Sequence, residues 1–166
     1  MSITSKDSIF FCSGILGALI ILFGLAQTNA QVYFVVGAVF LLATALHFKL
    51  TYFIALELIL IAGHGAMLMG LGPVSQLVLP ILLSIQLLTY YILSGQLGNV
   101  FRLTGIAGIA LLSIGFSYQN QWVFFLGSLC ITLFSIYQVM QGRRVAIIWV
   151  ILNMLFAIIA ASRLIF

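Results

Sequence analysis

The sequence predicts an all-α, polytopic membrane protein with about seven transmembrane helices and a weak parallel internal repeat. Three observations predict this fold: 64% of the 166 residues are hydrophobic and 5% are charged, the apolar residues form seven long runs, and basic residues mark every second gap. Soluble domains carry roughly 25% charged residues, so six basic and two acidic side chains could not keep a folded body in water. A soluble domain and a nucleic-acid partner are therefore excluded. The distant Cys12 and Cys130 also exclude a disulfide scaffold.

A helix that spans the hydrocarbon core of about 30 Å needs about 20 mostly apolar residues. Polar, glycine and proline residues divide the chain into seven such runs, and the short connections leave no room for a domain outside the bilayer. We therefore expect one transmembrane domain over 1–166. Its predicted spans are 8–26, 31–48, 51–71, 74–94, 102–118, 121–141 and 144–166.

The basic residues predict the orientation of these spans. With seven spans, the N-terminus and every second connection lie on one side of the membrane, and that side holds five of the six basic residues. By the positive-inside rule this side is cytoplasmic, so we expect a bacterial-type inner membrane, a cytoplasmic N-terminus and a periplasmic C-terminus. The exception, Arg163, can extend to the headgroups. The five residues are Lys6, Lys49, Arg102, Arg143 and Arg144.

A short pattern of glycines recurs about 90 residues along the chain and predicts two parallel repeats, 8–94 and 102–166. Parallel repeats occur in transporters, with sites at the repeat interface. The alternative is coincidence, because small residues are common wherever membrane helices touch. A true repeat also argues that 8–26 is a retained span and not a signal peptide. The recurring residues are Gly14, Gly17, Gly24, Gln31, Phe34 and Gly37, matched by Gly105, Gly108, Gly115, Gln121, Phe124 and Gly127.

Glu57 is the only carboxylate expected inside the hydrocarbon. An acid at the centre of a spanning helix costs about 2.5–3.5 kcal/mol on insertion scales, so it indicates function by default. His64 follows two turns later on nearly the same face. At 1.5 Å per residue the two lie about 9 Å and about 20 Å from the start of their helix, on either side of the midplane. An acid and an imidazole on one face suit a proton path; the alternative for each is a structural hydrogen bond.

The next span, 74–94, runs back antiparallel. The same helical rise places Gln86 at about the depth of Glu57 and Pro80 at about the depth of His64. Pro80 removes a backbone donor and usually kinks a helix, and a kink opposite an ionisable pair would open a small hydrated pocket. We therefore add Gln86 to the predicted ion path.

The last span offers hydrogen-bonding side chains where an acid is absent. Trp149 and Asn153 are candidate substrate-lining residues there, and a structural interhelical hydrogen bond is the alternative for Asn153. The chain shows no metal-ligand spacing, no P-loop and no catalytic triad. The histidines His47 and His64 lie at different depths, which disfavours a haem with two histidine ligands. We therefore expect no enzymatic activity, no catalytic residue, no metal and no cofactor.

The segment 49–72 has a basic turn, Ala55-Leu56-Glu57 buried in a helix, then small residues and a turn into another helix. This pattern resembles the small K-type membrane subunit of complex I and of Mrp antiporters, and more closely the component E family of hydrogenase-4-type complexes. The resemblance covers spans two to four well and six and seven weakly. It implies that Glu57 is the buried glutamate of a proton path, that His64 matches the family histidine loosely, and that the partner is a larger antiporter-like membrane subunit.

A second resemblance concerns seven helices with parallel repeats, which are similar to the three-plus-one-plus-three sugar and vitamin-precursor transporters (SWEET-like proteins). Trp149-Val150-Ile151-Leu152-Asn153 resembles the Trp-x-x-x-Asn pattern of nicotinamide riboside transporters. This resemblance implies a substrate pocket that Trp149 and Asn153 line.

Three hypotheses of function follow. The leading one is an inner-membrane subunit that contributes a proton or cation path to a larger antiporter-like complex. The second is a small-molecule facilitator of the parallel-repeat type. The third is a structural membrane subunit in which Glu57 only makes a buried hydrogen bond.

Overall fold

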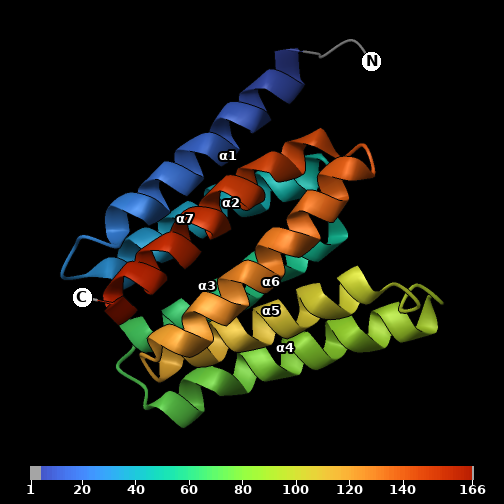
Figure 1. Cartoon of the computed structure of the whole chain (residues 1–166). Coiled ribbons are helices and arrows are strands. Elements are labelled where there is room, and N and C mark those ends of the chain that lie inside the picture. The colour runs from blue at the N-terminus through green and yellow to red at the C-terminus, as the bar shows by residue number, and fades with distance from the viewer. Residues whose placement is uncertain (1–4, 166) are drawn as a thin grey trace.

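The computed structural model describes residues 5–165, which form seven α-helices joined by short turns (Figure 1). Each helix has 18 to 21 residues and is apolar enough to cross a bilayer. All boundaries lie within one helical turn of the predicted spans, so the seven-helix prediction is confirmed; the predicted final residue, Phe166, lies outside the described range. The helices are α1 (Ser5–Gly24), α2 (Ala30–His47), α3 (Thr51–Leu68), α4 (Pro73–Leu93), α5 (Val100–Ser117), α6 (Gln121–Met140) and, after a 3₁₀ turn (Arg144–Ala146), α7 (Ile147–Ile165).

Five successive helices, α2 to α6, end in the same left-handed cap. The residue with positive φ after each helix is, in chain order, Lys49, Gly70, Gly95, Gln119 and Gly142. In each case the next residue donates its N–H to the carbonyl five residues before it. This hydrogen bond satisfies a carbonyl that the helix end leaves free. Each chain reversal is therefore tight, and consecutive helices run antiparallel.

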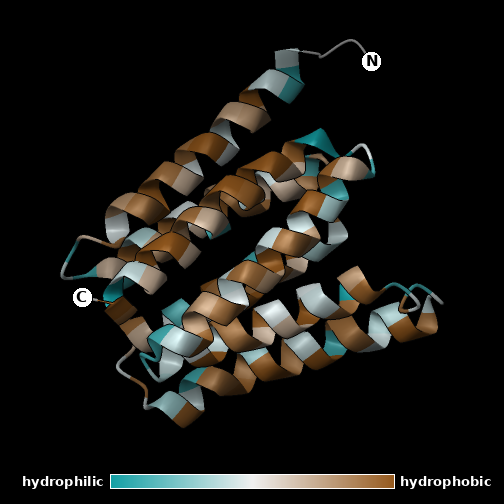
Figure 2. Cartoon of the chain, in the orientation of Figure 1, coloured by the Kyte–Doolittle hydropathy of each residue, from teal (hydrophilic) through white to brown (hydrophobic). Residues whose placement is uncertain are grey.

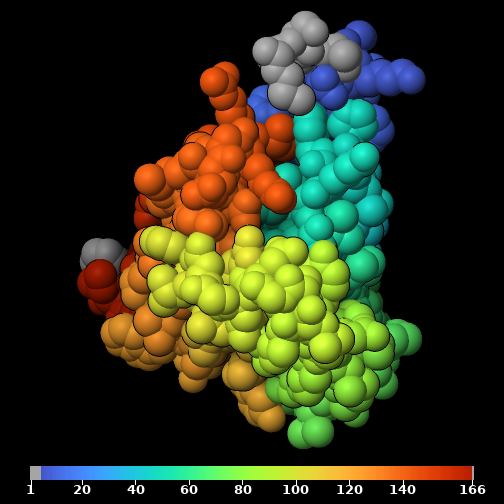
Figure 3. Space-filling model, turned by 90° about the vertical axis from the view of Figure 1, so that its right-hand side faces the viewer, coloured from blue at the N-terminus to red at the C-terminus, as the bar shows by residue number. Residues whose placement is uncertain are grey.

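The helices pack as two groups of three with α4 at the edge. Consecutive helices pack together within α1–α3 and within α5–α7, and the groups meet where α3 contacts α5 and where α1 contacts α7. The fourth helix makes its main contacts with α3 and α5 and covers one face of the bundle (Figures 1 and 3). It is also the span with the smallest buried share.

Glycines set the closest helix approaches in both groups. A Cβ atom at Gly17 would lie 2.6 Å from the carbonyl oxygen of Gly37, between α1 and α2. A Cβ atom at Gly127 would lie 2.7 Å from the backbone nitrogen of Leu112 and 3.1 Å from the carbonyl oxygen of Gly108, between α6 and α5. Such distances are too short for a side chain, so only glycine permits this backbone contact.

The outer surface of the bundle is apolar along its length. Large aliphatic side chains are exposed on all seven helices, and hydrophilic residues gather mostly at the helix ends (Figure 2). The N-terminal end of the chain and the α4–α5 and α6–α7 connections lie at one end of the bundle, and the C-terminus lies at the other (Figure 1). An apolar exterior of this length needs a hydrocarbon solvent, so the protein is an integral, multi-pass membrane protein.

Candidate functional site

Glu57 lies in the middle of α3 and faces the inside of the bundle, with 1% of its surface exposed. The indole Nε1 of Trp149 on α7 donates a hydrogen bond of 2.7 Å to its Oε1 atom. Its second oxygen, Oε2, is buried and has no hydrogen-bond partner among the described residues. The carboxyl group therefore joins the two helix groups through one oxygen and keeps the other available.

Trp149 and Asn153 lie one turn apart on the inner face of α7. The Trp149 ring is fully buried and stacks on Phe53 of α3 with centroids 4.3 Å apart. The Asn153 side chain donates from Nδ2 to the carbonyl of Trp149 at 3.0 Å. This bond follows the helix, whereas the indole bond to Glu57 crosses between helices.

His64 is held by a glutamine and two aromatic rings. Its Nδ1 lies 2.7 Å from Oε1 of Gln31 at the start of α2. An amide oxygen only accepts hydrogen bonds, so Nδ1 carries the hydrogen in this pair and Nε2 is left as the acceptor of a neutral imidazole. The rings of Phe34 and Phe116 lie 4.9 Å and 4.5 Å from the His64 ring.

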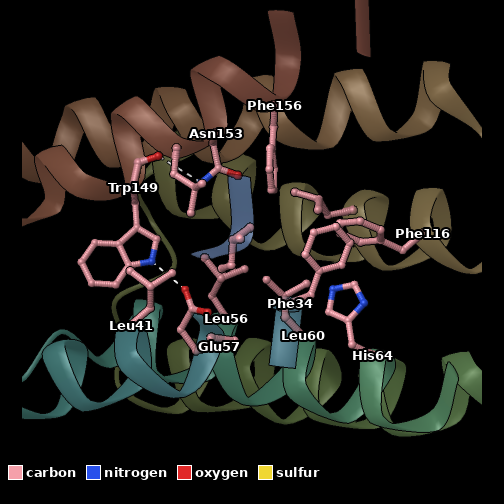
Figure 4. Close-up of a pocket in the computed structure, with 14 residues that line it drawn as sticks. Phe34, Leu41, Leu56, Glu57, Leu60, His64, Phe116, Trp149, Asn153 and Phe156 are labelled. Carbon is pink, nitrogen blue, oxygen red and sulfur yellow. Dashed lines mark hydrogen bonds between the residues drawn. The ribbon is translucent and has the colours of Figure 1, made fainter. Parts of the chain in front are cut away.

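One cavity brings these residues together (Figure 4). It is lined by α1, α2, α3, α5 and α7, and its polar lining side chains are Glu57, His64, Trp149 and Asn153. Glu57 and His64 do not touch, because Leu60 lies between them (Figure 4). The volume is about 20 Å³, enough for about one water molecule. Two of the residues predicted for an ion path, Glu57 and His64, thus share one site with the two predicted for a substrate pocket, Trp149 and Asn153.

Clusters of aromatic side chains lie toward both ends of the bundle from the cavity. Toward the end that bears the five basic residues, Trp149 stacks on Phe53, and Phe53 and Tyr52 contact Phe134. Toward the opposite end, the cluster is continuous from one ring to the next, with centroids 4.7 to 5.5 Å apart. That cluster consists of Phe34, Phe116, Phe124 and Phe156. Aromatic rings therefore border the site toward both ends of the bundle.

Gln86 does not join the site. Its side chain is exposed on α4, outside the residues that line the cavity. The buried face of α4 carries Pro80 and Ser84 instead, and the Ser84 hydroxyl donates to the Pro80 carbonyl at 2.7 Å. Helical rise predicts only the depth of a residue; the face that α4 presents to the bundle depends on its packing against α3 and α5.

Gln31 was not predicted as a site residue. The available signal was its place in the first turn of the second span, at the same end of the bundle as His64. The aromatic cluster of Phe34, Phe116, Phe124 and Phe156 was not predicted either, because fourteen phenylalanines occur in the chain and nothing in their spacing marks these four.

The other groups that could bind a metal are dispersed. Within residues 5–165 no three His, Cys, Asp or Glu side chains come together. His47 pairs instead with Asp7 of α1 through Nε2 and Oδ1 at 2.9 Å, and it stacks on Phe10. This pair lies at the end of the bundle, remote from the cavity.

The site thus holds one acid, one imidazole, one indole and one amide inside an apolar bundle. Such a set can bind and release protons or a single positive charge, and it offers no nucleophile with an activating base. Comparison with protein-family models, with curated protein sequences and with solved structures finds no match.

Proposed function

We propose that the protein is an inner-membrane subunit that carries a proton or cation path in a larger antiporter-like complex, with Glu57 as the exchanging group. The observation that carries the proposal is the carboxyl group in the central cavity, with one oxygen bonded to Trp149 and the other without a partner among residues 5–165. A purely structural acid would be expected to satisfy both oxygens, because a buried unpaired oxygen costs about 1–3 kcal/mol. An exchanging group needs one oxygen left for its ion.

His64 supports a path rather than an isolated acid. It borders the same cavity on the side toward the C-terminal end, and its Nε2 can accept a proton while Nδ1 stays on Gln31. Leu60 separates the two groups (Figure 4) and the cavity holds about one water, so a proton that passes from Glu57 to His64 requires Leu60 to move and further water to enter. We place the end with the five basic residues in the cytoplasm, so Glu57 lies nearer the cytoplasmic side.

Replacing each of the two acids tests this proposal. Glu57→Gln keeps an acceptor for Trp149 but cannot release a proton, and we expect proton flux in membrane vesicles that hold the intact complex to fall at least tenfold. Asp7→Asn, which removes the only other carboxylate of the chain, is the matched control and should leave the flux unchanged. Equal flux in wild-type and Glu57→Gln vesicles, at equal protein levels, would contradict the proposal and favour a structural subunit.

The second candidate is a small-molecule facilitator of the parallel-repeat type. The observation that favours it is that Trp149 and Asn153 line the same central cavity, between the two groups of three helices. The two candidates differ in their need for a partner. Uptake of a solute by proteoliposomes that contain this chain alone would favour the facilitator, and a strict requirement for a larger subunit would favour the ion path.

A further inference from the structure

We infer that the cation exchanged at Glu57 is a small monovalent organic cation, and that it reaches the cavity from the bilayer between α4 and α5. The inference rests on the proposed function and names the substrate class and the route of the same site.

The charge of the cavity favours a monovalent cation. Glu57 is the only acid among the lining residues, and its Oε2 is buried without a partner. The other titratable group of the lining is His64, and the lining residues from α1, α2, α5 and α7 do not titrate. Tyr52, one turn before Glu57, uses its hydroxyl to donate to the Gly105 carbonyl at 2.7 Å. When Glu57 is ionised, its one negative charge in this apolar enclosure is balanced by one positive charge.

The lining atoms favour an organic cation over a metal ion. Hard metal cations take about six oxygen ligands, and only Glu57 and Asn153 offer side-chain oxygens to the cavity. The rest of the lining is aliphatic or aromatic, including Trp149, Phe34, Phe116 and Phe156. Aromatic faces bind ammonium groups that carry their own apolar substituents. The chemistry of the lining therefore matches a quaternary or substituted ammonium, which the cavity can hold only after it widens.

The route follows three hollows that share walls. The central cavity and a second one of about 10 Å³ are both lined by Leu60, His64 and Phe116. The second cavity shares Pro80 and Ser113 with a groove of about 230 Å³ between α4 and α5. Apart from Ser84, the groove is otherwise lined by aliphatic side chains, and it lies on the membrane-facing side of the bundle. The three hollows are separate, and the side chains that they share place them in a row from the bilayer side of the bundle to Glu57.

The helix beside this route is the most loosely packed. A Cβ atom at Gly63 of α3 would touch only the ring of Pro80 on α4, at 3.4 Å, and one at Gly65 would meet nothing within 4 Å. Pro80 lacks the backbone donor that would complete the hydrogen bonds of α4. The cavity has room for about one water, so binding of a substituted ammonium requires Leu60 and Phe116 to move toward the space beside α4.

Binding of a probe cation tests the substrate class. The probe is benzyltrimethylammonium and its neutral isostere is neopentylbenzene, added to the purified chain in lipid nanodiscs. In a Trp122→Phe background the buried Trp149 is the only tryptophan left, so its fluorescence reports on the Glu57 bond. We expect a saturable change with the cation, at least tenfold weaker binding in Glu57→Gln, and no change with the isostere. Equal binding of the isostere, or equal binding by Glu57→Gln, would overturn the inference.

A pH series adds a second readout. Protons and the cation compete for Glu57, so the apparent affinity for the probe should fall as the pH is lowered. His64→Gln should keep this dependence, because His64 lies across Leu60 from the carboxyl group. If His64→Gln abolished the pH dependence, the proton that competes with the probe would bind at His64, and the role of Glu57 would be overturned.

A blocked groove tests the route. Ala110→Phe fills the groove between α4 and α5, and Ala107→Phe places the same side chain on the exposed side of α5. We expect Ala110→Phe to slow probe binding at least fivefold and to leave the equilibrium affinity within twofold, whereas Ala107→Phe changes neither. Equal binding rates in the two variants would overturn the lateral route.

Proton flux measured without the probe separates this inference from the proposed function. If Glu57→Gln abolishes flux but the wild-type chain does not bind the probe, the organic cation is wrong and the ion path stands. If flux does not depend on Glu57, the proposed function itself fails.

Discussion

In α1–α3 and in α5–α7, the first two helices of each group approach through glycines, Gly17 against Gly37 and Gly108 against Gly127. The third helices, α3 and α7, then meet the cavity from the two groups and differ in chemistry. The first group supplies the acid and the imidazole, Glu57 and His64, and the second supplies an indole and an amide. The two groups therefore pack alike but bring unlike chemistry to the cavity, and under the proposed function the first carries the ion while the second holds Glu57 in place. The predicted internal repeat stays a prediction, which these glycine contacts support.

The largest expected effect comes from breaking the packing that the two groups share. Gly17→Ala and Gly127→Ala would each press a methyl group against backbone atoms, so we expect a loss near the upper end of the roughly 1–3 kcal/mol typical of overpacking. Unfolding of the purified protein in mixed micelles measures it. Gly65→Ala is the control, since its Cβ meets nothing within 4 Å, and alanine in a helix interior gains about 0.5–1 kcal/mol over glycine. A large loss in only one of the two hairpins would show that they are not equivalent.

A smaller effect is expected at the bond that joins the groups. Trp149→Phe keeps the stacking on Phe53 but leaves Glu57 without its donor, which should lower the free energy of unfolding by about 1–3 kcal/mol. In a Glu57→Leu background the same change should cost at least about 1 kcal/mol less, because residues in direct contact are not additive. The four variants are compared by unfolding under identical conditions. Additive costs would mean that the two groups are held together by packing alone.

The smallest effect sharpens the comparison between matched glutamines. Gln31→Leu removes the partner of His64 and should cost about 0.5–1.5 kcal/mol, with a change in the ¹⁵N resonances of the imidazole as Nδ1 loses its acceptor. Gln121→Leu alters the residue at the matching position of α6, which does not line the cavity, and should leave both unchanged. The same imidazole shift in both variants would place the control of His64 elsewhere.

The seven spans could be predicted because they depend on local properties. Runs of apolar residues and tight turns define each helix without reference to its neighbours, so the helices from α1 to α7 begin and end within one turn of expectation. The prediction of Glu57 as a buried acid rested on the same kind of evidence, and its 1% exposure agrees with it. The flux measurements on Glu57→Gln test the role of this acid in transport.

The contacts of the site could not be predicted in the same way. Glu57 and Trp149 are 92 residues apart, and no periodicity relates an acid on one helix to an indole on another. Gln86 shows the same limit, since its predicted depth says nothing about the side of α4 on which it lies. The buried stripe of α4 is set by its neighbours α3 and α5, and it passes through Pro80 and Ser84 rather than Gln86.

The bond between Glu57 and Trp149 also has a consequence for biosynthesis. At about 5–20 residues per second, the ribosome needs about 5 to 20 seconds to add the 92 residues that separate the carboxyl group from its donor. During this interval the third helix must enter the bilayer with its acid protonated or in contact with water or another protein. Once the last helix is complete, Trp149 donates to Glu57, and the carboxyl group no longer needs water or another protein as its partner.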